Sequence, residues 1–254
     1  NYVSSAGFAV VTSKYENKAA FIDLQPPFER VRTAYLTDEA HFQETRNIGL
    51  GPKQWPPTFE GDPSWKPVVV KTIPVPQPTA VICSLVGGDR SRAMIASVDG
   101  TLRMFTVGGL STPDPADPDA IAEDGSIQLA RNPTCLTYPK GKQSTYIAVC
   151  RGDREIDWFS IGENQGVTKR LQDARLIDPV FAEVADTHGV SAGILTVADF
   201  KGQKILNYRY STLHFATQGG AKFGMGKDGT DDFECGGIME FPGCPFSISA
   251  SNVN

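Results

Sequence analysis

The fold is decided by one stretch, Ala93-Met-Ile-Ala-Ser-Val-Asp-Gly-Thr-Leu-Arg-Met-Phe-Thr-Val107. Two apolar runs flank Asp99-Gly100, and Asp-Gly between such runs is a strong signal for a tight β-hairpin turn. Three further pairs of runs are joined by short polar turns in the same way: 7–13 with 19–24, 145–150 with 155–161, and 194–198 with 204–210. The sequence therefore predicts four β-hairpins.

Each hairpin is part of a larger repeated unit. A strand that opens with proline precedes three of the hairpins, and a similar strand ends the chain: Pro78–Cys83, Pro133–Tyr138, Pro179–Val184 and Pro245–Ala250. A further strand precedes each of these, at 68–75, 126–130, 167–171 and 237–241. A recurring four-strand unit is typical of a β-propeller blade. We therefore expect an all-β protein, a single β-propeller domain over residues 1–254 with four four-stranded blades.

The ends of the chain leave two ways to close the ring. The strand 245–250 has no hairpin after it, and the hairpin 7–24 has no proline-opened strand before it. If 245–250 joins the N-terminal blade, four blades close on themselves and no free sheet edge remains. A four-blade portion of a larger ring fits the sequence equally well.

One blade junction resembles a known repeat. Val69-Val-Lys-Thr-Ile-Pro-Val75, followed by Pro78-Thr-Ala-Val81, is similar to the junction of YVTN-type β-propeller repeats of bacterial and archaeal surface or periplasmic proteins. The resemblance implies an extracellular or periplasmic location. The Tyr-Val-Thr-Asn stretch itself is absent, so the resemblance assigns no functional residue.

Three connections between strands are unusually long. They cover 25–67, 108–125 and 211–236, whereas the usual median is about 4–6 residues. Propeller topology places all three on the same face, so we expect this face to bind a protein partner or to mediate self-assembly. The first loop supplies the aromatic side chains for such contacts: Phe42, Trp55, Phe59 and Trp65.

Charge and hydropathy argue against two classes of partner. The 254 residues carry a formal net charge of −5, which disfavours nucleic acid as a partner. No apolar run approaches the roughly 20 residues of a membrane-spanning helix.

Two acidic clusters are the candidate metal sites. The first contains Asp114, Asp117 and Asp119, and the second contains Asp228 and Asp231. Calcium takes six to eight oxygen ligands, often from flexible loops rich in Asp and Gly. Neither cluster has the EF-hand spacing, so calcium binding is a hypothesis beside the plainer interpretation of solvated loops. The sequence predicts no other cofactor.

The five cysteines leave their pairing open. Cys135 and Cys150 lie on neighbouring predicted strands and are the better candidates for a disulfide. The alternative is that the thiols are buried and free.

The sequence contains no convincing catalytic set. Gly189-Val-Ser-Ala-Gly193 matches a nucleophile elbow, but a strand follows it where that motif needs a helix. Arg151-Gly152-Asp153 spells an integrin-binding tripeptide and also suits an ordinary hairpin turn.

We therefore expect a non-catalytic propeller that acts as a scaffold or protein-interaction module, with no catalytic or cofactor-binding residue assigned. The first alternative is a metal-assisted, lactonase-like hydrolase that uses Glu183, Asp186 and Asn132 near the central channel. The second is a non-catalytic subunit of a periplasmic redox complex.

Overall fold

The computed structural model describes nine segments of the chain: residues 4–46, 59, 63–84, 91–138, 145–184, 194–209, 213–216, 222–225 and 234–249. Contacts between residues divide the chain into two compact units. Unit 1 contains Asn1–Val75, Cys83–Ala93 and Met104–Asp124, and unit 2 contains Pro76–Ile82, Met94–Arg103 and Gly125–Asn254.

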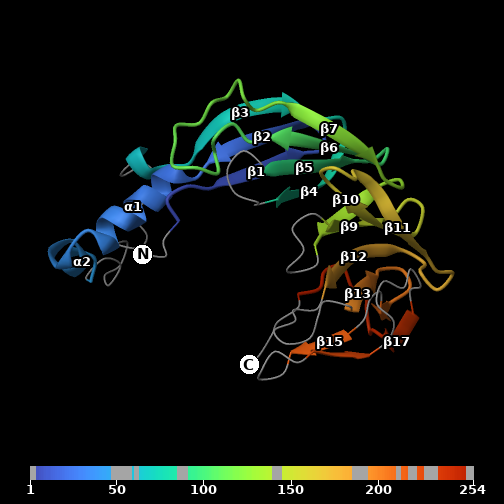
Figure 1. The fold of residues 1–254 in the computed structure, drawn as a ribbon. Helices are drawn as coiled ribbons and strands as arrows, with labels where there is room; N and C mark the ends of the chain where they lie inside the picture. The colour runs from blue at the N-terminus through green and yellow to red at the C-terminus, as the bar shows by residue number, and fades with distance from the viewer. Residues whose placement is uncertain are drawn as a thin grey trace. The chain divides into compact units, whose positions relative to one another are not determined.

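The described strands form four antiparallel blade sheets in chain order (Figure 1). The first sheet contains β1 (Phe8–Ser13), β2 (Lys18–Asp23) and β3 (Val68–Pro74). The second contains β4 (Pro78–Ser84), β5 (Arg92–Ser97), β6 (Thr101–Thr106) and β7 (Glu123–Gln128). The third contains β8 (Pro133–Thr137), β9 (Thr145–Cys150), β10 (Glu155–Ser160) and β11 (Gly166–Gln172). The fourth contains β12 (Pro179–Val184), β13 (Ile194–Asp199), β14 (Lys204–Arg209) and β17 (Glu234–Glu240). This mostly β architecture of four blades is the predicted β-propeller.

Three of the four strands that were expected to open with proline are present, and the prediction of the fourth, 245–250, is wrong. Pro78, Pro133 and Pro179 are the first residues of β4, β8 and β12. Residues 245–249, expected to form the strand that completes the first blade, form no strand, and the first sheet has three strands in the described residues. A proline at the first position is compatible with a strand, as in β4, β8 and β12, so the difference lies in the pairing: no described strand pairs with residues 245–249.

The core of unit 2 lies between the third and fourth blade sheets. β9, β10 and β13 are central strands, and most of their side chains are buried whichever face they point to. The cluster contains Cys135, Ile147, Val149, Ile156, Trp158, Leu171, Leu176, Ala182, Val184, Leu195, Val197, Leu206 and Tyr208. Central strands covered on both faces have nearly continuous apolar sequences, which is why these runs were recognisable.

Within unit 1, the first sheet packs through an aromatic pair. Phe21 of β2 and Phe105 of β6 meet edge to face with ring centroids 6.1 Å apart, and both rings are buried. Lys71 of β3 donates two hydrogen bonds from Nζ, to the carbonyls of Pro118 at 2.6 Å and Ile121 at 2.8 Å. The segment 108–122 is therefore attached to the sheet at several points.

The predicted Asp-Gly turn depends on a glycine. Gly100 has a φ of +88°, and a Cβ atom there would lie 2.4 Å from the carbonyl oxygen of Leu129. Its own carbonyl accepts the Leu129 N–H at 2.9 Å. Only glycine allows both this φ and this approach of the two backbones.

Helices and a hairpin occupy two regions that were expected to be long loops. Residues 25–67 contain α1 (Gln25–Leu36), α2 (Glu39–Thr45) and the short 3-10 helix η1 (Pro63–Trp65). Pro26 and Pro27 suit the first turn of α1, where backbone N–H groups have no helical partner. Residues 211–236 contain a hairpin of β15 (Leu213–Ala216) and β16 (Lys222–Met225).

Two buried carboxylates, Asp199 and Asp178, accept hydrogen bonds at the connection between the third and fourth sheets. Asp199, fully buried at the end of β13, accepts three backbone N–H groups: Asp178 at 2.8 Å, Gly202 at 3.0 Å and Ile177 at 2.6 Å. Asp178 in turn binds the guanidinium of Arg151 through two hydrogen bonds of 2.5 and 2.7 Å. A carboxylate that accepts several N–H groups stabilises a turn that has no strand neighbour.

All five cysteines are free in the structure. In the β8–β9 register Cys135 lies opposite Val149 and Cys150 lies opposite Pro133, so the two thiols are not cross-strand partners. Burial raises the pKa of Cys135 to about 11 and raises that of Cys150 further above its ordinary value. Of the two interpretations of the sequence, the structure has free thiols, of which those of Cys135 and Cys150 are buried.

Replacing Asp199 by alanine would leave three backbone N–H groups without an acceptor. We expect Asp199→Ala to lower the free energy of unfolding by at least about 3 kcal/mol, measured by chemical denaturation. Glu163→Ala, which removes an exposed carboxylate in a turn, is the matched control and should change it by less than about 0.5 kcal/mol. Equal stability of the two variants would contradict the role of Asp199.

Thiol accessibility separates free cysteines from a disulfide. Because Cys244 is exposed while Cys135 and Cys150 are buried, we expect iodoacetamide at neutral pH to label Cys244 first in the native protein. Peptide mass spectrometry measures the sites. In denaturant without reductant, all five should be labelled; a pair that stays unlabelled until a reductant is added would reveal a disulfide.

Candidate functional site

The candidate site is the helical insertion, which we define as α1 and α2, residues 25–45, between β2 and β3. Within unit 1, both helices extend beyond the end of the first sheet (Figure 1). Asp38 caps α2 by accepting the His41 N–H at 3.0 Å, and it also lies 2.9 Å from His41 Nδ1. This contact lowers the pKa of Asp38 and raises the pKa of His41. Neither helix contains a buried residue.

Apolar side chains on the insertion are exposed. We define the insertion surface as Val31, Tyr35, Leu36 and Phe42, which are 43%, 48%, 46% and 42% exposed. Val31 and Tyr35 follow Phe28 at helical spacing, so the three lie on one side of α1. The Phe28 ring lies against Gly7, where an added Cβ would be 2.7 Å from Cε2. The first residue of this apolar stripe is therefore placed against the chain just before β1, while Val31 and Tyr35 are more than 40% exposed.

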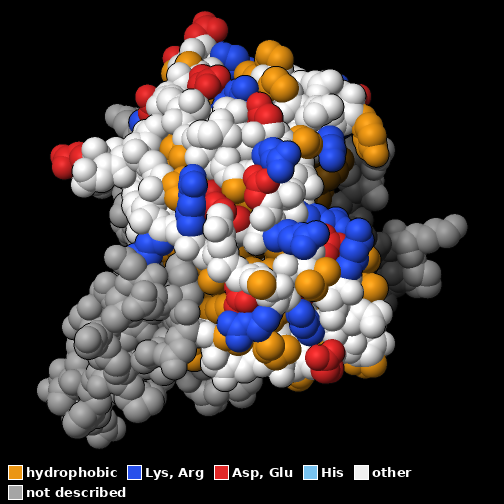
Figure 2. All heavy atoms as spheres, turned by 90° about the vertical axis from the view of Figure 1, so that its right-hand side faces the viewer, with side chains coloured by type: hydrophobic (Ala, Val, Ile, Leu, Met, Phe, Trp, Pro, Cys, Tyr) orange, Lys and Arg blue, Asp and Glu red, His pale blue; other side chains and the backbone are white. Residues whose placement is uncertain are grey.

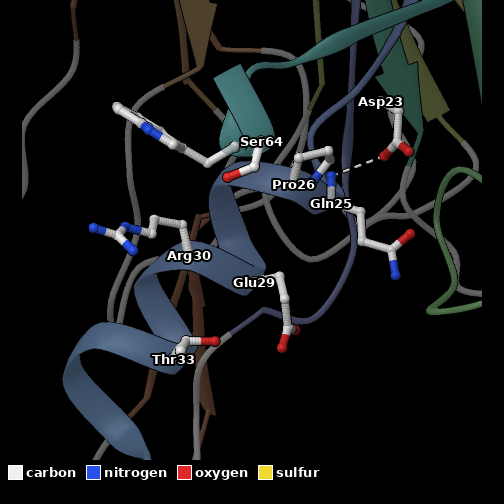
Figure 3. Close-up of a pocket in the computed structure, with 8 residues that line it drawn as sticks. Asp23, Gln25, Pro26, Glu29, Arg30, Thr33 and Ser64 are labelled. Carbon is white, nitrogen blue, oxygen red and sulfur yellow. Dashed lines mark hydrogen bonds between the residues drawn. The ribbon is translucent and has the colours of Figure 1, made fainter. Parts of the chain in front are cut away.

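A pocket of about 430 Å³ lies between the start of α1 and η1. It is lined by Asp23, Gln25, Pro26, Glu29, Arg30, Thr33, Ser64 and Trp65. In Figure 3 Arg30 points to the opposite side of α1 from Glu29, and Asp23 and Gln25 lie on the side of Glu29. The charged groups drawn do not converge on one point, so the pocket does not have the arrangement of a catalytic centre.

The structure describes three of the four aromatic residues predicted for interaction. Phe59 and Trp65 contact each other with ring centroids 4.5 Å apart, outside the insertion. Phe42, on α2, is part of the insertion surface. Trp55 lies outside the described residues.

The acidic residues predicted to bind calcium have local roles where they are described. Asp117 Oδ1 accepts the Asp119 N–H at 2.9 Å, and Asp114 Oδ2 accepts the Thr112 hydroxyl at 3.3 Å. Asp228 and Asp231 lie outside the described residues. Among the residues that are described, no three His, Cys, Asp or Glu side chains form a group that could hold a metal ion. Calcium binding stays a prediction.

The tripeptide Arg151-Gly152-Asp153 is engaged in the fold of unit 2. Arg151 is bound to Asp178, and Asp153 accepts hydrogen bonds from Arg131 at its backbone N (2.7 Å), Nε (2.8 Å) and Nη2 (2.6 Å). Both charged groups of the tripeptide therefore have internal partners, as the turn interpretation predicts.

Figure 2 shows a side of the molecule on which Lys and Arg side chains are interspersed with Asp and Glu.

The structure does not bring together the residues considered for a hydrolase. Thr134 donates to the Val180 carbonyl at 2.8 Å, and the Cys135 thiol lies 3.5 Å from that of Ala182, so β8 and β12 run in the same direction side by side. Asn132 precedes β8, whereas Glu183 lies near the end of β12. They therefore lie at opposite ends of this strand pair. Asp186 and the segment 189–193 lie outside the described residues.

A buried pair of carboxylates was missed by the sequence analysis. Glu155 and Asp157 of β10 are 4% and 0% exposed. The signal was present, because two acids alternate with the apolar residues Ile156 and Trp158 in a strand whose neighbours are apolar.

Comparison with solved structures shows the fold. The chain is similar to a candidate 6-phosphogluconolactonase from Bacteroides fragilis, with 9% identity and a TM-score of 0.50 over 83% of this chain and 50% of that one. It is also similar to a protein of unknown function from Desulfotomaculum acetoxidans, with 8% identity and a TM-score of 0.51 over 97% of this chain and 70% of that one. A chain of an active polycomb repressive complex 2 matches with 10% identity and a TM-score of 0.50, over 82% of this chain and 35% of that one.

These likenesses confirm the β-propeller fold and, at such identities, nothing finer. The chain spans half of the Bacteroides chain and about a third of the polycomb chain. Neither a protein-family model nor a curated protein matches the sequence. The YVTN-type repeat therefore stays a prediction. In the described part of the chain, no helix is both long and apolar enough to cross a membrane.

Proposed function

We propose that the protein is a non-catalytic interaction module that binds a protein partner through the insertion surface. The observation that supports this most is the pair of helices with no buried residue, on which Val31, Tyr35, Leu36 and Phe42 are 42–48% exposed. Amphipathic helices of globular proteins normally bury such apolar side chains against their own chain.

The composition of the insertion surface suits a protein partner. Tyr and Phe are frequent among the residues that contribute most to binding, and burying one such side chain is worth about 1.5–3 kcal/mol. Charged residues surround the apolar ones: Glu29 pairs with Arg32 at 3.3 Å, and Asp38 pairs with His41. An apolar centre with a polar rim is the usual anatomy of a protein interface.

The blade sheet gives the insertion a firm base. The Leu24 N–H, at the start of α1, donates to the Gly7 carbonyl at 2.9 Å, and the Gln25 N–H donates to Asp23 Oδ1 at 2.8 Å. Gln25 Nε2 also reaches the Pro113 carbonyl at 3.2 Å. These bonds fix the first turn of α1 to the strands of unit 1, so the insertion surface is presented from a defined position.

Removing one aromatic side chain from the insertion surface tests the proposal. Partners are captured from an extract of the source cells, identified, purified and titrated against the protein by calorimetry. We expect Tyr35→Ser to weaken binding at least about tenfold, because a buried interface aromatic is worth more than about 1.4 kcal/mol.

The matched control is Tyr15→Ser, which removes a 96% exposed tyrosine from the β1–β2 turn and should change affinity less than about twofold. Circular dichroism verifies that both variants fold. An unchanged dissociation constant in Tyr35→Ser and Phe42→Ser would contradict the proposal. Reversible dimerisation of the purified chain that these substitutions abolish would show self-assembly through the same surface instead.

Lactone hydrolysis is a second candidate function, supported by the likeness of fold to the Bacteroides fragilis protein. Glu183 is the residue on which it would depend, since it lies half-buried in β12 beside the thiol of Cys135. No observation in the described segments favours the third expectation, a subunit of a redox complex. The expected extracellular or periplasmic location rests on the resemblance to YVTN-type repeats.

A screen with sugar-acid lactones and added divalent cations separates the two functions. Under the interaction-module proposal, turnover should not exceed the buffer rate, and Glu183→Gln should change nothing. Turnover above the buffer rate that Glu183→Gln lowers by at least about tenfold would establish the hydrolase and overturn the non-catalytic assignment. A pH-stat records the acid released.

A further inference from the structure

The buried acidic pair of β10 has too little positive charge around it. Glu155 and Asp157 are two residues apart in a strand, so both side chains point to the same face. One cation lies near them: Arg170 of β11, with Nε 3.3 Å from Glu155 Oε1 and 3.5 Å from Asp157 Oδ1. Its side chain is 56% exposed, so solvent weakens its effect on two carboxylates that have almost no solvent of their own.

The other groups around the pair come from three further places. Gln172 of β11 donates from Nε2 to Glu155 Oε2. The Ala130 N–H, from the connection between the second and third sheets, donates to Asp157 Oδ2 at 2.8 Å. Cys150 of β9 has its thiol sulfur 3.9 Å from the same oxygen. Asp153, in the β9–β10 turn, is bound to Arg131. None of these adds a second cation to the pair.

One oxygen of the pair lacks a hydrogen-bond donor when both acids are ionised. Asp157 Oδ1 is buried and, in the described structure, has no hydrogen-bond partner beyond its 3.5 Å ion-pair contact with the Arg170 Nε. A buried polar atom in this state is costly, and a proton held between two adjacent carboxyl groups removes the cost. We propose that Glu155 and Asp157 share one proton and act as a pH-sensitive latch on the segment 129–132.

The segment 129–132 is the part of the fold that the latch would hold. It connects β7 with β8, and its N–H groups donate both to turn residues of the second sheet and to a side chain of the third. Leu129 donates to Gly100 at 2.9 Å and Asn132 to Val98 at 2.8 Å, while Ala130 donates to Asp157. Loss of the shared proton places two ionised, buried carboxylates next to each other, and their repulsion acts directly on the strand that anchors Ala130.

The electrostatics of the site agree with this geometry. Burial, together with the adjacent Glu155, raises the pKa of Asp157 to about 7, against the opposing effects of the Ala130 N–H and Arg170. An acid whose pKa is higher in the folded state binds its proton more tightly when folded. Its contribution to stability is therefore complete below the unfolded pKa, near 4, and is lost as the pH rises to about 7.

Denaturant unfolding across pH tests the latch in the intact chain. We expect the unfolding equilibrium constant of the wild type to rise by up to about tenfold per pH unit between about pH 5 and pH 7, relative to Asp157→Asn at the same pH. Asparagine can still accept from Ala130 and can donate to Glu155, so it mimics the protonated acid. Glu163→Gln, which changes an exposed carboxylate in the β10–β11 turn, is the control and should keep the wild-type slope.

A direct titration by ¹³C NMR of the side-chain carboxyl carbons decides the outcome. One carboxyl of the pair is expected to titrate near neutral pH, and hydrogen exchange at Ala130 should lose protection above that pH in the wild type alone. Glu155→Gln is the second variant if Asp157→Asn does not fold, and it should also abolish the slope. If both carboxyls titrate below about pH 5, or if the substitutions leave the slope unchanged, the latch is overturned.

Discussion

The segments that join one sheet to the next carry backbone N–H and C=O groups with no strand neighbour, and the fold depends on how these are paired. The carbonyl before each opening proline accepts from the residue that follows the next strand: Gln77 from Val98, Asn132 from Arg151, and Asp178 from Phe200. Since proline has no N–H, this carbonyl is what continues the pairing at the strand's first residue. Each connection is thereby fixed before its strand begins.

Buried aspartate carboxylates accept further backbone N–H groups of these connections. Asp199 and Asp157 are both fully buried, and each accepts an N–H from the connection that leads to its own sheet. They differ in their surroundings. Asp199 receives three N–H groups, whereas Asp157 receives one and has Glu155 beside it. The same residue type therefore serves as a fixed anchor at one connection and as a titrating group at another.

Periodic features of the sequence predicted the fold well, and irregular ones did not. Apolar runs around Asp99-Gly100 and the prolines at 78, 133 and 179 located the blade sheets because burial and turn geometry are local demands. Helix α1 was missed because Gln25-Pro26-Pro27 suggests a loop, although prolines are well suited to a helix's first turn. The strand 245–250 was predicted from similarity to the other opening strands, but strand pairing depends on a partner that the sequence does not specify.

The candidate site was only partly within reach of the sequence. The first long connection and its Phe42 were recognised as an interaction region, while Val31, Tyr35 and Leu36 could not be assigned because their exposure depends on how far α1 extends past Gly7. The sequence could not show that Glu155 and Asp157 are buried, because their burial follows from the packing of β9 and β11 on either side of β10.

The free thiols have a consequence for where such a chain can fold. Because no sulfur–sulfur bond links the described strands, packing, hydrogen bonds and ion pairs hold the blades together. We therefore expect the described strands to pair in the same way in reducing and in oxidising surroundings.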